Sequence, residues 1–149
     1  MEIFIRSIAE QDAEAINALS TQLGYAMPIE QTLANIRSVL GTRGHNAFVA
    51  IFENKIIGWI GVAEALQIES APFCEIRGVI VDERYRGRGI GKLLIEKVKQ
   101  WGKETQKKTL RLRCNMTRKD AHLFYQHLGF KEIKEQKVFE MDLNSQFHS

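Results

Sequence analysis

Apolar residues recur along the chain at two spacings, and these spacings predict a regular order of strands and helices. Short apolar runs, or runs in which apolar and polar residues alternate, are typical of strands. Apolar residues three or four positions apart are typical of amphipathic helices. The predicted strands cover residues 3–8, 47–52, 56–66, 73–81, 110–114, 130–133 and 138–143. The predicted helices cover residues 15–23, 28–40, 90–101 and 117–128.

This order, β-α-α-β-β-β-α-β-α-β-β, predicts an α/β fold with a mixed, mostly antiparallel sheet and helices on both faces. The strands at 73–81 and 110–114 are joined through a helix, so we expect them to be parallel neighbours. A tight turn is expected at 53–55, and Gly58 and Gly61 indicate bends or close backbone contact within their strand. The chain has no repeat or linker, so we expect one domain over residues 1–149.

A glycine-rich turn follows the strand that ends at Val81. Gly87, Gly89 and Gly91 leave little side-chain bulk there, and the helix that begins at Ile90 follows at once. The first N–H groups of a helix have no partner inside the helix, and the helix dipole is positive at that end. Glycines let a ligand approach such a backbone closely. The arrangement therefore favours a phosphate-binding site.

Two familiar phosphate loops do not fit this turn. A Walker loop needs four residues between its first glycine and the Gly-Lys pair, then Ser or Thr. Here three residues separate Gly87 from Gly91, and Leu93 follows Lys92. A dinucleotide fingerprint reads Gly-x-Gly-x-x-Gly near the start of a βαβ unit, whereas this run is Gly-x-Gly-x-Gly in mid-chain.

Composition and charge limit the classes of partner that we expect. The net charge of +3 is too small to argue for a nucleic-acid partner, although basic residues gather around the glycine turn, where a polyanionic ligand or a solvated basic face would explain them. No segment resembles a signal peptide or a membrane span. Cys74 and Cys114 lack metal-ligand spacing and are interpreted as small buried residues in a reducing compartment. We therefore expect a cytoplasmic protein without metal, nucleic-acid or membrane partners.

Two motifs resemble those of the GNAT superfamily of N-acetyltransferases. Arg86-x-x-Gly89-x-Gly91 resembles the family's acyl-CoA pyrophosphate loop. The segment 121–130, Ala-His-Leu-Phe-Tyr-Gln-His-Leu-Gly-Phe, resembles its Ala-x-x-Phe-Tyr-x-x-x-Gly-Phe segment. The predicted order of elements is also that of the GNAT fold, so the resemblance covers essentially the whole chain and implies acetyl-CoA as co-substrate.

The resemblance implies a set of residues that bind acetyl-CoA. The strand residues Val79, Ile80 and Val81 are expected to pair edge-on with the pantetheine arm, and the Val79 N–H to stabilise the thioester oxyanion. Arg86 opens the pyrophosphate loop. The backbone amides of six residues are expected to hold the pyrophosphate: Gly87, Arg88, Gly89, Ile90, Gly91 and Lys92.

The resemblance also implies two catalytic residues. Tyr125 matches a tyrosine that protonates the departing thiolate, although its helix face is also compatible with a packing role. Glu75 matches a general-base glutamate; an exposed strand-end acid is the alternative, and Glu64 is the other candidate base. Many members carry an asparagine where this chain has Arg118, and Asn115 lies further back.

The activity that the resemblance implies is direct transfer of acetyl from acetyl-CoA to a primary amine of a small molecule or a protein. The alternative is a non-catalytic module that binds acyl-CoA as a sensor. The segments 25–28 and 67–73 are expected to flank the acceptor site, because loops vary freely on a common scaffold. The sequence does not identify the amine, and it is also compatible with a homodimer.

Overall fold

The computed structural model of the chain describes residues 1–114 and 119–144. The chain forms two compact units, Met1–Arg113 and Cys114–Ser149. Each unit is described by itself below.

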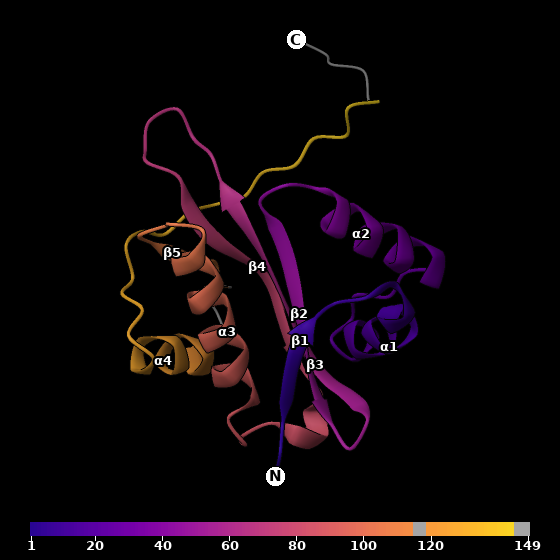
Figure 1. Ribbon diagram of the computed structural model, residues 1–149. Helices are drawn as coiled ribbons and strands as arrows, with labels where there is room; N and C mark the ends of the chain where they lie inside the picture. Colours follow the sequence, from indigo (N-terminus) through magenta and orange to yellow (C-terminus); the bar gives the residue numbers. More distant parts are fainter. Residues whose placement is uncertain (115–118, 145–149) are drawn as a thin grey trace. The chain divides into compact units, whose positions relative to one another are not determined.

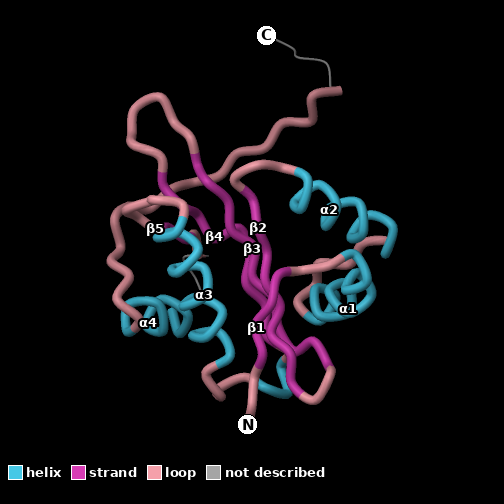
Figure 2. Tube along the Cα trace, in the orientation of Figure 1, coloured by secondary structure: helices cyan, strands magenta, loops and turns pink. Residues whose placement is uncertain are grey.

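The first unit is built on a five-stranded sheet in the order β1-β2-β3-β4-β5 (Figures 1 and 2). The strands are β1 (Phe4–Ser7), β2 (His45–Phe52), β3 (Lys55–Ala65), β4 (Phe73–Val81) and β5 (Leu110–Leu112). The helices are α1 (Ala13–Gln22), α2 (Ile29–Gly41) and α3 (Ile90–Glu104), with two 3-10 turns, η1 (Glu10–Asp12) and η2 (Glu83–Tyr85). The first three strand pairs are antiparallel, and β4–β5 is parallel. The predicted mixed α/β sheet is thus confirmed.

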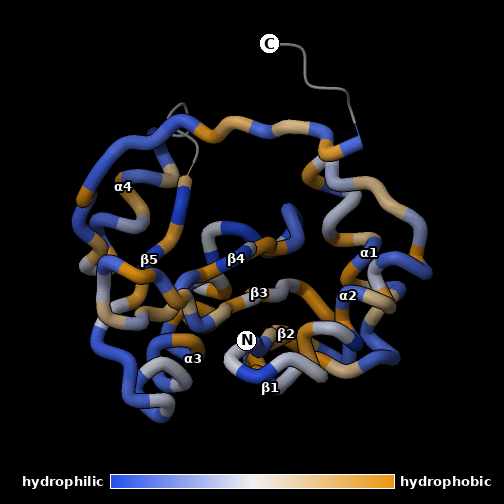
Figure 3. Tube along the Cα trace, turned by 90° about the horizontal axis from the view of Figure 1, so that it is seen from above, coloured by the Kyte–Doolittle hydropathy of each residue, from blue (hydrophilic) through white to orange (hydrophobic). Residues whose placement is uncertain are grey.

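Helices cover both faces of this sheet, as predicted. Seen from above, α3 lies on one side of the strands, and α1 and α2 lie on the other (Figure 3). Alternate residues of β2 divide between these faces: Ala47 and Val49 join the buried cluster of α1 and α2, whereas the Phe48 ring lies 5.5 Å from Lys97 Nζ of α3. On α3 the buried side chains recur at helical spacing: Ile90, Leu94, Ile95 and Val98. The alternating apolar residues of the strands and the apolar faces of the helices therefore pack together as the layers of the core.

The β2–β3 hairpin turns on two residues without glycine. Glu53 and Asn54 have φ of 49° and 63°, and Phe52 pairs with Lys55. Two central residues with positive φ match the backbone twist of a hairpin, and asparagine tolerates that conformation better than most residues. The tight turn predicted at 53–55 is confirmed.

A β-bulge interrupts the β3–β4 pair. Gly61 pairs with Gly78 and Val62 pairs with Ile76, so Arg77 is the extra residue on β4. Gly78 has to be glycine because the Trp59 ring occupies its side-chain space; a Cβ there would lie 2.9 Å from Trp59 Cη2. Gly61 thus marks an irregularity, as its sequence position indicated.

The second unit contains the helix α4 (Lys119–His127). The helix ends at Gly129, whose φ is 102°, and the Gly129 and Phe130 N–H groups donate to the Gln126 and Tyr125 carbonyls. A left-handed glycine closing a helix in this way is a common C-terminal cap. The helix predicted over residues 117–128 is confirmed for its described part, and residues 117 and 118 lie outside the described residues.

The strands predicted at 130–133 and 138–143 are wrong. The structure has no strand in residues 130–144, and the apolar side chains there are exposed: Ile133 by 64%, Phe139 by 88% and Leu143 by 90%. Alternation of apolar residues shows only that a segment could cover one face of a sheet. A strand also needs a neighbour with which to share hydrogen bonds, and none is described for these residues.

Candidate active site

The glycine turn joins β4 to α3 and presents a helix N-terminus. Gly87 and Gly89 have φ of 77° and 82°, in the left-handed region that disfavours a side chain, and both are exposed. The Leu93 N–H donates to the Gly89 carbonyl at 3.1 Å, so helical hydrogen bonding starts there. The N–H groups of Ile90, Gly91 and the residue after them therefore have no partner within the helix. This is the backbone geometry that binds phosphate.

A buried carboxylate fixes the start of the turn. The Asp82 side chain is 5% exposed and accepts hydrogen bonds from the Arg84 backbone N–H at 3.0 Å and from the Arg84 guanidinium at 3.1 and 3.3 Å. The guanidinium hydrogen bond holds the pKa of Asp82 below its usual value. The Glu83 N–H donates to Gln22 Oε1 at 3.3 Å, which ties the turn to the end of α1.

Cationic side chains surround the turn. Arg86, Arg88 and Lys92 are exposed, and the Arg88 guanidinium lies 5.6 Å from the centre of the Tyr85 ring. A pyrophosphate carries several negative charges, and these side chains add attraction to the backbone donors. The residues that the sequence assigned to a pyrophosphate loop are consecutive and exposed to solvent, except Ile90, which is buried, and Gly91, which is half-buried.

The edge of β4 beyond Ile76 is open within Met1–Arg113. The β4–β5 pairing joins Cys74, Glu75 and Ile76 to residues 110–112, and β4 continues to Val81. On the other edge the pairing with β3 extends to Val81. The predicted pantetheine-binding residues 79–81 therefore have one paired edge and one edge at which an extended ligand can add as a strand would.

Glu75 is buried, so the alternative of an exposed strand-end acid is wrong. The residue is 5% exposed, and its carboxylate forms ion pairs with Arg77, at 2.8 Å from Nη1, and with Arg113, at 3.4 Å from Nε. A carboxylate has about four acceptor positions, so it can bind an amine or a water molecule in addition to these two arginines.

The other candidate base lies on the opposite face of the sheet. Glu64 pairs in register with Cys74, the residue next to Glu75, and neighbouring strand residues point to opposite faces. Glu64 is 37% exposed and lies 3.3 Å from Lys107 Nζ.

Three arginines that the sequence analysis did not assign to a site gather around Glu75. Arg111 pairs in register with Glu75 and so lies on the same face of the sheet. Its guanidinium lies 4.0 Å from the centre of the Phe73 ring, and its Nε is buried without a hydrogen-bond partner among the described residues. Arg77 and Arg113 complete the group through their ion pairs with Glu75. In the sequence, the Arg-x-Arg at 111–113 and the Glu-x-Arg at 75–77 were the features that could have indicated this group, because the two strands were expected to be parallel neighbours.

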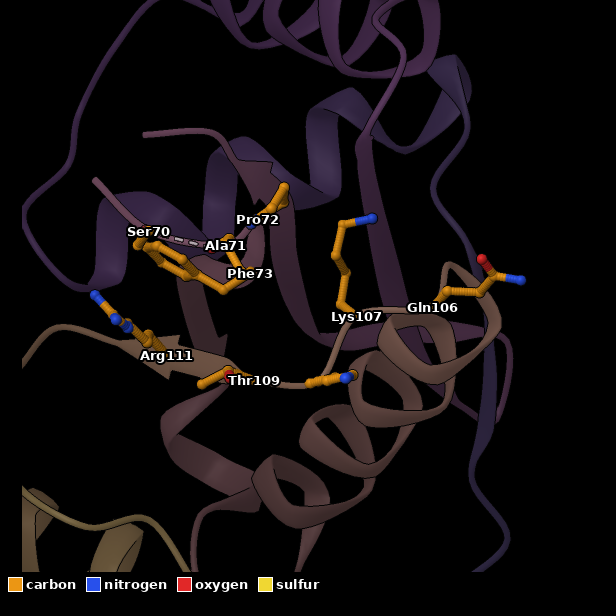
Figure 4. A pocket seen from close by; sticks show the side chains of 9 residues that line it. Ser70, Ala71, Pro72, Phe73, Gln106, Lys107, Thr109 and Arg111 are labelled. Atoms are coloured by element: carbon orange, nitrogen blue, oxygen red, sulfur yellow. Dashed lines mark hydrogen bonds between the residues drawn. The ribbon is translucent and has the colours of Figure 1, made fainter. Parts of the chain in front are cut away.

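A pocket of about 420 Å³ adjoins this group at the beginning of β4 and β5 (Figure 4). Its wall is formed by residues 70–72 of the β3–β4 loop, Phe73, residues 106–109 and Arg111. In Figure 4 the Arg111 side chain extends along Phe73, and Lys107 rises from the α3–β5 loop. The loop expected to flank an acceptor site thus lines a pocket.

Tyr125 lies on α4 in the second unit. It is half-buried, and its ring packs edge-on against Phe124 and Phe130 with centroids 5.4 and 6.1 Å away. This packing is compatible with either predicted role, so the acid role stays a prediction. Asn115 and Arg118 lie outside the described residues.

Among the described residues no group of three or more His, Cys, Asp or Glu side chains is arranged to hold a metal ion. In that same part of the chain, every helix is too short or too polar to cross a bilayer.

Comparison with known proteins gives the class of this protein. The acetyltransferase (GNAT) family model matches residues 12–130. The match covers more than half of the chain and agrees with the mixed sheet described above. The chain belongs to the GNAT family.

Two curated proteins are similar in sequence to part of this chain. The uncharacterized N-acetyltransferase MJ1207 of Methanocaldococcus jannaschii is 38% identical over 65 residues, 44% of this chain and 29% of that protein. The N-acetylaspartate synthetase of Xenopus tropicalis is 33% identical over 86 residues, 58% of this chain and 31% of that protein. The matches therefore span less than a third of the length of either relative.

Solved structures support the fold. The aminoglycoside N-acetyltransferase AAC(6')-Iy in complex with CoA superposes with a TM-score of 0.83 at 23% identity, covering 95% of each chain. At this identity the likeness concerns the fold alone.

Proposed function

We propose that the protein transfers an acetyl group from acetyl-CoA directly to a primary amine. The observation that carries the proposal is that the open edge of β4 is followed directly by an exposed glycine turn at the N-terminus of α3. An extended arm ending in a pyrophosphate needs these two features next to each other along one strand. Acetyl-CoA has that form, and the family match supports it.

The backbone would bind the donor. The amides of residues 87–92 would hold the pyrophosphate, and Arg86, Arg88 and Lys92 would balance its charge. The pantetheine arm would lie along residues 79–81, with its amides bonded to the open edge of β4. The Val79 N–H would then donate to the thioester oxygen and stabilise the negative charge that develops there during the reaction.

Side chains would move the protons. An alkylammonium group titrates near about 10, so the acceptor has to lose a proton before it attacks. Glu75 would take that proton, directly or through a water molecule. The amine nitrogen then bonds to the thioester carbon, the carbon–sulfur bond breaks, and Tyr125 gives its proton to the departing thiolate. The second proton that the nitrogen loses would return to the Tyr125 phenolate through water, and Glu75 would release its proton to solvent. The products are the N-acetylated amine and free CoA.

The relatives leave the acceptor open. One is named for N-acetylaspartate and one structural neighbour for aminoglycosides, and these acceptors differ in charge, since aspartate is anionic and aminoglycosides are rich in amines. Because the matches are partial or distant, neither name transfers to this chain.

The test measures binding and chemistry separately. Calorimetry gives the affinity of the purified chain for acetyl-CoA, and thiol release is followed with a panel of primary amines, with the acetylated product identified by mass spectrometry. We expect release that depends on the amine. Tight binding without release from any amine would instead favour an acyl-CoA sensor, and absence of binding would contradict both functions.

A further inference from the structure

The group formed by Glu75, Arg77, Arg111 and Arg113, here called the arginine cluster, carries more positive charge than its carboxylate balances. Two guanidinium groups form ion pairs with one carboxylate, and a third, that of Arg111, belongs to the residue paired in register with Glu75. Arginine cannot lose its charge in a protein. One guanidinium group would suffice to pair with Glu75. The cluster therefore has a formal surplus of two positive charges on one face of the sheet.

Arg111 has a buried hydrogen-bond donor that a ligand could use. Arg111 stacks on Phe73, which fixes the plane of its guanidinium, and its buried Nε has no hydrogen-bond partner among the described residues. A buried N–H without a partner is unfavourable, so such donors usually meet a protein group, water or a ligand. The planar fork of arginine matches the paired oxygens of a carboxylate or a phosphate.

The pocket beside the cluster has the size of a small metabolite site. Its volume of about 420 Å³ falls near the lower end of the ~300–1,000 Å³ usual for ligand sites. Arg111 belongs to both the cluster and the pocket wall, and Phe73, Lys107 and Lys108 line the same wall. The pocket and the cluster thus share one positively charged border.

From these observations we propose that the acceptor is a primary amine that also carries an oxyanion, a carboxylate or a phosphate, which the arginine cluster binds. This inference rests on the proposed acetyl transfer and names the substrate class for the same site. The amine would meet Glu75 while the oxyanion meets Arg111 and its neighbours. A polycationic acceptor would place its extra positive charges against three guanidinium groups, so it would be rejected.

The first experiment compares acceptors that share a short alkyl amine. Propylamine carries no other charge, β-alanine adds a carboxylate, 2-aminoethyl phosphate adds a phosphate, and 1,3-diaminopropane adds a second cation. We expect kcat/KM for the better of the two anionic amines to exceed that of propylamine by about tenfold or more, as for a charge-assisted pair. The diamine should fall below propylamine. Equal or higher values for propylamine or the diamine would overturn the inference while leaving acetyl transfer intact.

The comparison of β-alanine with 2-aminoethyl phosphate shows whether the oxyanion is a carboxylate or a phosphate. A preference for β-alanine, strengthened with L-aspartate, identifies amino acids as the acceptor class. A preference for 2-aminoethyl phosphate identifies amino alcohols esterified with phosphate. Either result supports the cluster as an oxyanion site.

Variants test whether the arginines act on the substrate. Arg111→Gln and Arg113→Gln should raise KM for the anionic amine about tenfold more than they raise KM for propylamine. Lys99→Gln removes an exposed charge from α3 and serves as the matched control. An equal loss with both acceptors would show that the arginines only support the fold, which contradicts the inference. Arg113 is 64% exposed, so its variant is expected to fold even if the Arg111 variant does not.

A binding measurement separates failure of the inference from failure of the proposed function. If no amine is acetylated although CoA binds, the proposed function fails, and calorimetry of the CoA-loaded chain with L-aspartate and 2-aminoethyl phosphate, each against 1,3-diaminopropane, still tests the cluster. Binding of either anionic compound that Arg113→Gln abolishes supports the oxyanion site. Absence of binding by both, or preference for the diamine, refutes it.

Discussion

The two ends of β4 differ in the groups that face a ligand. At the Val81 end, the groups are backbone amides, exposed by two glycines with positive φ and a helix N-terminus. At the Phe73 end, they are charged side chains contributed by β4 and β5, gathered around a buried carboxylate. The first end depends mainly on the backbone staying accessible, and nearby cationic side chains only add attraction. The second end depends on the identity of each residue, so specificity can change there without disturbing the first.

The largest effect should come from removing the buried carboxylate of the side-chain end. Glu75→Gln should lower the rate at neutral pH by about 10²–10⁴-fold, because a general base is lost. The defect should shrink at high pH, where more of the acceptor is already neutral. The measurement is a pH profile of kcat/KM.

Glu64→Gln is the comparison for this variant. A defect of equal size at every pH in Glu75→Gln would indicate positioning rather than proton transfer. A pH-dependent defect in Glu64→Gln instead would move the base to the other face of the sheet.

The backbone end should be broken by a single side chain. Gly89→Asp places a Cβ at a φ of 82° and a negative charge beside the bound phosphates. Affinity for CoA should fall by well over about tenfold, measured by calorimetry. Lys92→Gln keeps the backbone and should lose less, since it removes only one attractive charge. Unchanged affinity in a folded Gly89→Asp variant would remove the phosphate assignment.

Tyr125 tests whether the chemistry depends on a further side chain. Tyr125→Phe should keep the fold and the affinity for acetyl-CoA while lowering kcat about tenfold or more, as expected for loss of a general acid. The ring contacts with Phe124 and Phe130 need no hydroxyl group. Full activity of the variant would leave packing as the role of this residue and assign thiolate protonation to water.

The smallest effect concerns the carboxylate that anchors the backbone end. The pKa of Asp82 is lowered by its hydrogen bond from Arg84, so its contribution is fully present above the unfolded value of about 3.9 and is lost as the pH falls through the folded pKa. Asp82→Asn should lower the free energy of unfolding by about 1 kcal/mol at pH 7, because Arg84 is largely exposed.

This difference from the wild-type protein should shrink as the pH falls below the unfolded pKa of about 3.9. Chemical denaturation between pH 7 and pH 2.5 measures it, and Glu96→Gln, which removes an exposed carboxylate on α3, is the control. A difference that stays constant over this range would mean that the carboxylate charge is not what stabilises the turn.

The sequence predicted the backbone end more completely than the side-chain end. The turn is local: strand, glycines and helix follow one another within residues 79–94, so spacing alone indicates the geometry. At the other end, the structure places Arg77 beside Glu75, near the beginning of β4. That contact and the pairing of Arg111 with Glu75 depend on strand register, which single-sequence patterns do not fix.

The strands predicted at 130–133 and 138–143 show where local sequence patterns fail. Residues 138–143 alternate well enough to predict a strand, yet the structure leaves them exposed and unpaired among the described residues. Local pattern reports which side chains would share a face, whereas pairing depends on a distant partner. The hairpin at Glu53–Asn54 was predicted because both its strands and its turn lie close together in sequence.

The contact of Trp59 with Gly78 gives the protein an internal optical reporter. The chain has two tryptophans, and the indole N–H of Trp59 is buried without a hydrogen-bond partner among the described residues, so its fluorescence should lie toward the blue. Its ring lies on the bulge of β4, in the strand whose open edge is assigned to the donor. With Trp101→Phe, the remaining emission would come from this one ring. Occupancy of the strand edge could then be followed by light in a stopped-flow instrument, with no label attached.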